Sequence, residues 1–306
     1  MTRGVVTKST GNLCAVRTEQ GEEIVCGIRG KLRTQGIRST NPVAVGDVVE
    51  LEEENGAFRI TRIGERRNYL IRKSTNLSKE SHILAANIDQ AVILVTISHP
   101  ETSTVFIDRF LATAEAYRIP AVIIFNKTDL YTETESARLE ELTAIYTGIG
   151  YPCYAVSVLQ NRNIDAVRQL LKGKTTVISG LSGVGKSSLI NAAEPGLKLK
   201  TASISLSHDT GKHTTTFAEM FTLRDGGAII DTPGIRSFGM IDMKKEEISH
   251  YFPEIFRYAA KCRFYNCTHL HEPGCAVLEA IRQGAISESR YFSYLSLMEE
   301  DGKYRQ

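Results

Sequence analysis

The stretch from Gly180 to Ser187 restricts what this chain can fold into more than any other part of the sequence. It reads Gly-Leu-Ser-Gly-Val-Gly-Lys-Ser and lies between the run Thr176–Ser179 and a helix-like stretch. Glycines at this spacing let backbone N–H groups turn inward around phosphate groups, and such a loop joins a strand to a helix. The sequence therefore predicts an α/β fold with a phosphate-binding loop. The alternative is a glycine-rich turn that binds no ligand.

Two side chains at the end of this loop would act on bound phosphates. Lys186 would reach the terminal phosphates, and the hydroxyl of Ser187 would coordinate magnesium. The residues that we expect to contact a nucleotide in this region are Gly180, Ser182, Gly183, Val184, Gly185, Lys186, Ser187 and Ser188.

A second motif, Asn126–Asp129, indicates which nucleotide base the site would bind. It follows the apolar run Ala121–Phe125, and open α/β sheets bind ligands beyond the carboxyl ends of their strands. The carboxylate of Asp129 can accept hydrogen bonds from N1–H and the exocyclic amino group of guanine. Adenine offers neither donor, which would cost about 1–3 kcal/mol. Asn126 would hold the loop and the purine edge, and the stem of Lys127 would cover the base. Alone, this tetrapeptide also fits a polar turn before a helix.

A third motif, Asp-Thr-Pro-Gly, follows the apolar run Gly227–Ile230. Asp231 at the end of that strand would hold the magnesium shell, and the N–H of Gly234 would approach the γ-phosphate. A plain turn is the alternative for this segment.

The polar segment Gly211–Thr216 lies between the phosphate loop and the third motif. Its consecutive threonines suit a switch that becomes ordered when a hydroxyl meets magnesium. Thr215 is the first candidate for that contact and Thr214 is the second.

The order of these motifs along the chain is unusual. Asn126–Asp129 precedes the phosphate loop, whereas the usual GTPase begins with that loop, so the sequence predicts a circularly permuted GTPase. The loop around Ala155, Val156 and Ser157 falls where the fifth motif is expected, with backbone N–H groups for the guanine oxygen. It lacks the Ser-Ala-Lys sequence that is usual for this motif, which weakens that assignment.

Three of the six cysteines cluster near the C-terminus in the pattern Cys262-x4-Cys267-x-His269-x5-Cys275. Three thiols and one imidazole form a closed tetrahedral set that suits one structural zinc ion. His271 lies in the same span and is the alternative ligand to His269. Free cysteines in a helical domain are the alternative to a metal site.

The remaining sequence predicts two further kinds of structure. Up to about residue 68, short strands alternate with turns such as Asn55–Gly56, which indicates a small β-barrel of the OB or SH3-like kind. From about residue 85, buried strands alternate with helices over Ser103–Tyr117 and Glu135–Tyr146, which indicates a doubly wound parallel sheet. After about residue 240 the chain reads as helical.

Charge and hydropathy narrow the functional class. The net charge of +2 points neither toward nor away from nucleic acid, but residues 59–79 hold seven basic residues and one acid. A basic barrel would bind an RNA backbone, and a solvated linker is the alternative. No apolar run approaches the roughly 18 residues of a membrane span, and no secretory signal is seen, so we expect a cytoplasmic protein without membrane partners.

Together these motifs resemble the ribosome small-subunit-dependent GTPases, the RsgA family, also called YjeQ or YloQ. The most specific matches are the motif order, Gly211–Thr215 and the Cys262–Cys275 cluster. The resemblance covers the whole chain. It implies a multi-domain protein with an OB-like RNA-binding barrel at 1–70, a circularly permuted α/β P-loop GTPase domain at 71–240 and a mainly helical zinc-binding domain at 241–306.

The resemblance also implies an activity and its partners. These are hydrolysis of GTP to GDP and phosphate with magnesium, stimulation by the small (30S) ribosomal subunit and its rRNA, and a role in late maturation of that subunit. The chain is expected to act as a monomer. The alternative is an rRNA-binding module for which GTP is only a structural ligand. A metabolic kinase is disfavoured, because the sequence shows no acceptor-site motif.

Ile235 stands where Ras-like enzymes place the glutamine that orients the attacking water. An aliphatic side chain cannot orient water, and the family resemblance implies that a histidine of the switch segment substitutes for it. The matching residue is His213, which completes an expected catalytic set with Lys186 and Thr215. The alternative is that His213 is a solvated loop residue.

Overall fold

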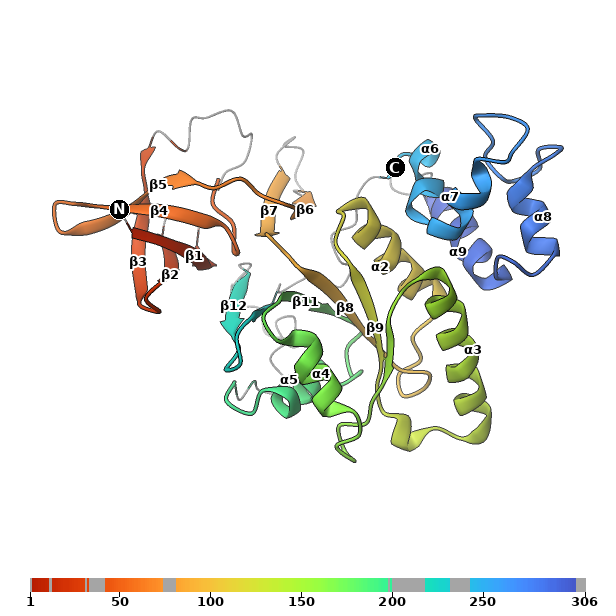
Figure 1. Cartoon of the computed structure of the whole chain (residues 1–306), viewed down its shortest axis with the longest axis horizontal. Coiled ribbons are helices and arrows are strands. Elements are labelled where there is room, and N and C mark those ends of the chain that lie inside the picture. The colour runs from red at the N-terminus through yellow and green to blue at the C-terminus, as the bar shows by residue number, and fades with distance from the viewer. Residues whose placement is uncertain are drawn as a thin grey trace, which may run out of the picture.

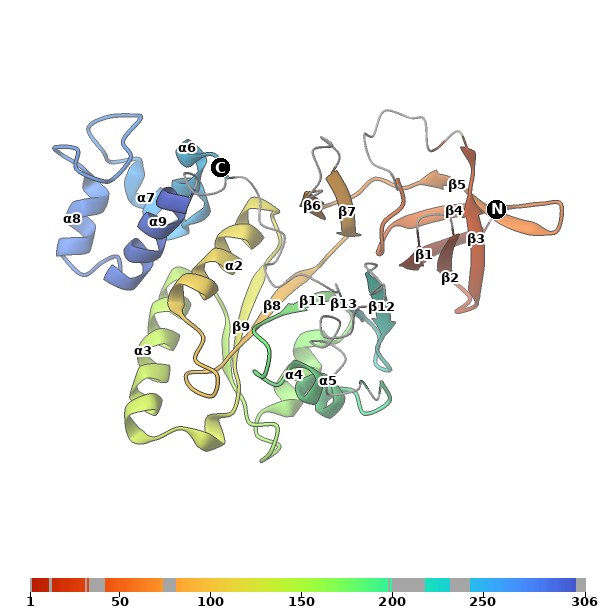
Figure 2. The same ribbon diagram turned by 180° about the vertical axis from the view of Figure 1, so that it is seen from behind.

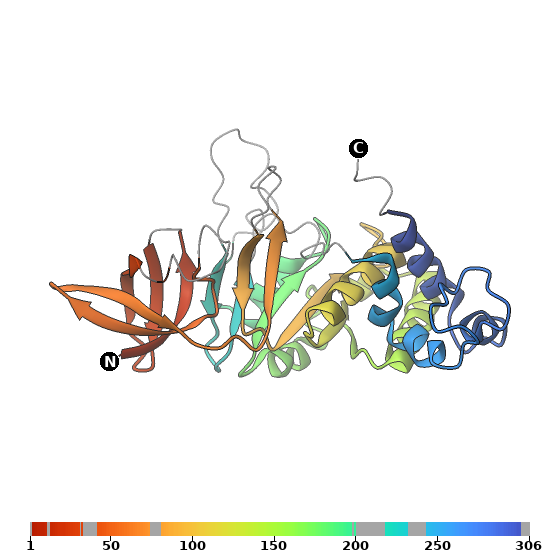
Figure 3. The same ribbon diagram turned by 90° about the horizontal axis from the view of Figure 1, so that it is seen from above.

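The protein has three parts arranged in a row, with a β-barrel at one end, an α/β domain in the middle and a helical part at the other end (Figures 1 and 3). The structure is a computed structural model. It describes residues 2–10, 13–30, 32, 42–73, 81–197, 199, 218–231 and 243–300.

The N-terminal part is a closed five-stranded barrel. The strands follow the order β1-β2-β3-β5-β4, and β4 pairs back onto β1, so the sheet closes on itself. Asn55 and Gly56, with φ of 53° and 78°, join the last two strands in the hairpin that the sequence predicts. The predicted barrel is therefore confirmed. Its strands are β1 (Thr2–Ser9), β2 (Leu13–Thr18), β3 (Glu23–Ile28), β4 (Val48–Glu54) and β5 (Ala57–Ile63).

The central sheet follows the order β10-β9-β8-β11-β13-β12, and neighbouring strands are parallel except for the antiparallel edge strand β12. Along β8, Ile93 faces one hydrophobic core and Val92 the other. Burial on both faces explains why the strand reads as a continuous apolar run. The strands are β8 (Gln90–Val95), β9 (Ala121–Phe125), β10 (Cys153–Ala155), β11 (Thr175–Ser179), β12 (Glu219–Thr222) and β13 (Ala228–Asp231).

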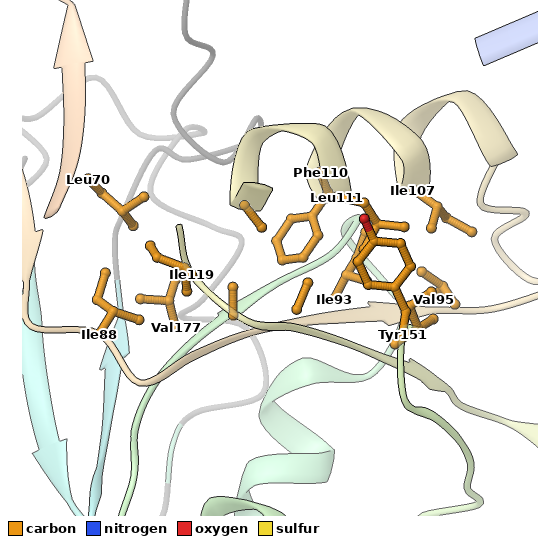
Figure 4. Close-up of a cluster of buried hydrophobic side chains, with 14 of the residues drawn as sticks. Leu70, Ile88, Ile93, Val95, Ile107, Phe110, Leu111, Ile119, Tyr151 and Val177 are labelled. Atoms are coloured by element: carbon orange, nitrogen blue, oxygen red, sulfur yellow. The ribbon is translucent and has the colours of Figure 1, made fainter. Parts of the chain in front are cut away.

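Helices cover both faces of this sheet, α2 and α3 on one side and α4 and α5 on the other (Figure 2). Ser103 caps α2 by accepting a hydrogen bond from the N–H of Phe106, and a capping box between Thr132 and Glu135 begins α3. Figure 4 shows the first core, in which Phe110 and Leu111 of α2 pack over Ile93. The helices are α2 (Thr104–Ala116), α3 (Glu133–Ile149), α4 (Ile164–Leu171) and α5 (Lys186–Ala193), with a short 3₁₀ turn η1 (Thr128–Leu130).

Two features join the barrel to the central domain, and the sequence predicts neither. A hairpin of β6 (Tyr69–Lys73) and β7 (Ser81–Ala86) places Leu70 in the core of the central domain. The edge strand β12 pairs with β1 through Lys8 and Glu219, whose side chains lie 3.2 Å apart. The barrel and the central sheet therefore form one continuous hydrogen-bonded sheet.

The C-terminal part packs against α2 through α9 (Figure 1). Its elements are α6 (Lys245–Ile248), η2 (Ser249–Tyr251), α7 (Pro253–Ala259), α8 (Ala276–Arg282) and α9 (Glu288–Glu300). Arg290 of α9 is buried at the contact, where it bonds Asp108 of α2 and Glu254 of α7. No helix within the described ranges is both long and apolar enough to cross a bilayer.

Candidate nucleotide site and metal centre

The phosphate loop joins β11 to α5, as the sequence predicts, and its glycines are required by geometry. Gly180 has φ +148°, and a Cβ added there would lie 2.3 Å from the carbonyl oxygen of Leu94. At Gly185, with φ +97°, a Cβ would lie 2.6 Å from Nδ2 of Asn126. Any larger side chain at either position would push the loop out of this conformation.

Lys186 begins α5 and its ammonium lies across the loop. Its Nζ donates to the carbonyl oxygens of Gly180 and Leu181 at 2.7 Å each. Burial lowers the pKa of Lys186, and the carboxylate of Asp231 acts in the opposite direction. The ammonium is therefore partly desolvated and held at the loop, where phosphate oxygens would replace the carbonyls as stronger partners.

The loop Asn126–Asp129, which the sequence predicts to read guanine and which we call the guanine-reading loop, contacts the phosphate loop directly. Asn126 is buried, and its Nδ2 donates to the carbonyl oxygen of Val184 at 2.8 Å. Its Oδ1 is buried without a hydrogen-bond partner among the described residues, which is the kind of polar atom that a ligand or water satisfies. Lys127 has φ +63°, and its Nζ donates to the carbonyl oxygen of His99 at 2.5 Å. Sequence motifs more than fifty residues apart thus meet at one edge of the sheet.

The loop after β10 contacts the same motif. The hydroxyl of Ser157, which is fully buried, donates to Oδ1 of Asp129. The hydroxyl of Thr128 donates to the carbonyl oxygen of Val156 at 3.0 Å. The N–H of Ser157, in the loop that the sequence assigns to the guanine oxygen, donates to the carbonyl oxygen of Arg162 at 3.2 Å. In this arrangement Ser157 orients the carboxylate that would read the base, a contact that sequence spacing does not reveal.

The other predicted nucleotide residues divide into two sets. Ser182 and Gly183 are exposed in the phosphate loop, Ser187 is buried and Ser188 half-buried in the first turn of α5, and Asp231 ends β13. The remaining candidates are His213, Thr214, Thr215 and Gly234, and all of them lie outside the described residues.

The cysteine cluster converges on one point. The ligand atoms of Cys262, Cys267, His269 and Cys275 all lie within 4.8 Å of one another. Nδ1 of His269 is 3.6 Å from Sγ of Cys262 and 3.5 Å from Sγ of Cys275. His269 is buried, whereas His271, the alternative ligand, is exposed and outside the cluster. Three thiols and one imidazole at these distances fit a closed tetrahedral zinc site.

Hydrogen bonds hold the metal-binding loop in place. The carboxylate of Glu272 accepts from the N–H groups of Thr268 and Leu270 at 2.7 and 3.0 Å. Tyr291 of α9 donates to the carbonyl oxygen of His269 at 2.7 Å. Burial raises the pKa of the Cys267 thiol to about 12 and lowers the pKa of His269. A divalent cation would supply the positive charge that thiolates need in this environment.

The basic segment predicted to bind RNA is partly neutralised by acidic neighbours. Arg66 is nearly buried and pairs with Asp47 at 2.6 Å, so it serves the fold. Arg67 pairs with Asp89 at 2.8 Å but is 65% exposed, and Arg62 is 73% exposed. Part of the positive charge counted in the sequence therefore holds the barrel together, and the exposed arginines are what it can offer to a polyanion.

Two family models and several curated relatives match this chain. The RsgA GTPase family model matches residues 63–241, and the RsgA N-terminal domain model matches residues 3–58. The small ribosomal subunit biogenesis GTPase RsgA of Bacteroides fragilis is 58% identical over 99% of both chains. The protein of that name from Porphyromonas gingivalis is 56% identical over 99% of this chain and 98% of its own.

Two solved structures share the fold over nearly the full length. The crystal structure of YjeQ from Thermotoga maritima superposes with a TM-score of 0.81, at 38% identity and 98% coverage of both chains. That of YloQ, described as a circularly permuted GTPase, gives a TM-score of 0.76 at 31% identity, covering 100% of this chain and 98% of its own. With the family model spanning more than half of the chain, the protein belongs to the RsgA GTPase family.

Proposed function

We propose that this protein hydrolyses GTP to GDP and phosphate, that the small ribosomal subunit stimulates the reaction, and that it acts in late maturation of that subunit. The observation that carries the proposal is the hydrogen bond from Nδ2 of Asn126 to the carbonyl oxygen of Val184. It joins the guanine-reading loop to the phosphate loop, so one ligand with both groups fits the site. We infer the ribosomal partner from the names of the full-length relatives, which are small ribosomal subunit biogenesis GTPases.

Each site residue has a proposed task. Asp129, oriented by Ser157, reads the guanine edge, and Lys127 covers the base. Lys186 neutralises charge that develops on the phosphates. Electrostatic stabilisation of this kind supplies most of the catalysis of phosphoryl transfer. Magnesium bound with GTP would supply positive charge that stabilises the phosphate groups. Ser187 and Asp231 are its proposed holders.

The switch segment Gly211–Thr216 would complete the site when a partner is bound. Thr215 is proposed to reach magnesium, Gly234 to contact the γ-phosphate, and His213 to orient the attacking water in place of the missing glutamine. Turnover by the free protein would then be slow. If His213→Ala left subunit-stimulated hydrolysis unchanged, His213 would have no such task.

The other two parts of the chain are proposed to hold rRNA. We propose the domain limits 1–70, 71–240 and 241–306. The barrel offers its exposed arginines to the RNA backbone, and one structural zinc on Cys262, Cys267, His269 and Cys275 shapes the C-terminal domain. We place the protein in the cytoplasm as a monomer.

GTP hydrolysis measured with and without purified small subunits tests the proposal, with ATP as the control nucleotide. We expect slow GTP turnover that rises sharply with the subunit and no comparable use of ATP. Turnover indifferent to the subunit, with tight RNA binding that ignores nucleotide, would favour the alternative of a binding module.

A further inference from the structure

The hydroxyl of Tyr131 is hydrogen-bonded to two loops and has no part in the function proposed above. It donates to the carbonyl oxygen of Asn126 at 2.6 Å and accepts from the N–H of Ile97 at 2.9 Å. Burial raises the pKa of Tyr131, so the phenol keeps the proton that it donates. One side chain thus ties the guanine-reading loop to the connection between β8 and α2.

The carbonyl group that Tyr131 holds belongs to the peptide just before Lys127. Lys127 has φ +63°, a left-handed conformation that is strained for a residue other than glycine. The hydrogen bond from the phenol offsets part of that strain. The phenol therefore stabilises the turn that sets the direction of Lys127 and, two residues later, of Asp129.

Two hydrogen bonds close the second loop, residues 96–102. Thr96 accepts from the N–H of Thr102 at 3.0 Å, and its hydroxyl donates to the carbonyl oxygen of Pro100. Pro100 in turn lies beside the phosphate loop, with its Cδ 3.6 Å from where a Cβ of Gly183 would be. The loop 96–102 can therefore fix the guanine-reading loop relative to the phosphate loop.

We propose that Tyr131 is a positioning residue for guanine recognition, acting on the bound base through Asn126, Lys127 and Asp129 without touching it. This inference rests on the proposed function, because it concerns the same nucleotide site. Without the phenol, binding would have to re-form the turn each time, and a site that is not preorganised binds more weakly.

The variant Tyr131→Phe removes only the hydroxyl. The probes are GDP and IDP with magnesium, measured by isothermal titration calorimetry. IDP lacks the exocyclic amino group, so it makes one bond fewer to Asp129. We expect the Kd for GDP to rise roughly 5- to 10-fold, as the loss of one hydrogen bond implies. The Kd for IDP should rise less, so the ratio of the two affinities should fall. A purely structural role would leave that ratio unchanged.

Tyr151→Phe is the matched control, because it removes a phenol that donates to Glu115 at 3.0 Å away from these loops. It should leave both dissociation constants unchanged. If Tyr131→Phe does not fold, Thr96→Val tests the inference in its place. This variant keeps the shape of the side chain but removes the hydrogen bond to Pro100. Its ratio of GDP affinity to IDP affinity should also fall. An unchanged ratio in the folded variant overturns the inference alone. A wild-type protein that binds ADP as well as GDP overturns the proposed function instead.

Discussion

Replacing Arg290 with methionine should loosen the C-terminal helices from the central domain. The guanidinium bonds Oδ1 of Asp108 at 2.7 Å and the two carboxylate oxygens of Glu254 at 2.6 and 3.2 Å. The side chains of Arg290, Asp108 and Glu254 are 1%, 0% and 7% exposed. Removing one partner of such a buried pair leaves uncompensated charge and costs about 3–5 kcal/mol. At roughly 2–4 °C per kcal/mol, the Tm should fall by about 6–20 °C.

The loss of stability in Arg290→Met should become larger as the pH rises. Burial raises the pKa of Asp108 above its usual value, and the Arg290 guanidinium opposes that rise. Without the guanidinium the folded-state pKa rises further. A carboxyl group with a raised folded pKa contributes stability at low pH that is lost as pH rises through that pKa. The Tm difference between wild type and Arg290→Met should therefore be larger at pH 8 than at pH 5.5.

Thermal unfolding followed by circular dichroism measures this effect, because the chain contains no tryptophan for fluorescence. Arg282→Met is the control, since Arg282 is exposed and pairs with Glu279 at the surface at 3.0 Å, where pairs are worth about 0–1 kcal/mol. Adding Asp108→Asn and Glu254→Gln to Arg290→Met should restore much of the lost stability. If the triple variant is no more stable than the single one, unpaired charge is not the cause.

Three further predictions follow from the sites. His269→Ala should abolish the binding of one zinc per chain, measured by mass spectrometry of the native protein, while His271→Ala should retain it. A retained zinc in the first variant would contradict the ligand set. Asp129→Asn should weaken GDP binding by tenfold or more and favour XDP, because the amide can donate to the extra oxygen of xanthine. Unchanged titration curves for GDP and XDP would exclude Asp129 from base reading. Gly180→Ala should lower both Tm and GDP affinity, because its Cβ would lie 2.3 Å from Leu94 O, and a variant as stable as wild type would refute that clash.

Several elements could be predicted because their signals are local. The helix expected at Ser103–Tyr117 is α2 (Thr104–Ala116), and the one expected at Glu135–Tyr146 is α3 (Glu133–Ile149), which its capping box starts two residues earlier. The strand before the phosphate loop begins one residue earlier than expected.

Other features had no local signal. The β6–β7 hairpin was missed because its strands are short and because β6 lies within the basic stretch 59–79, which also fits a linker. The pairing of β12 with β1 was missed because it joins Glu219 to Lys8 across most of the chain. The role of Tyr131 depends on two backbone groups, and no side-chain pattern marks them.

By itself, the sequence determined the motifs, their permuted order, the ligand types of the metal cluster and the family. These features can be recognised from residue types at fixed spacing, which can be read from the sequence. Only the tertiary structure decided which histidine joins the cysteines, how Ser157 meets Asp129, and which basic residues are neutralised. Those outcomes depend on contacts between segments far apart in the chain, where packing decides which of several equally plausible side chains is buried beside a partner.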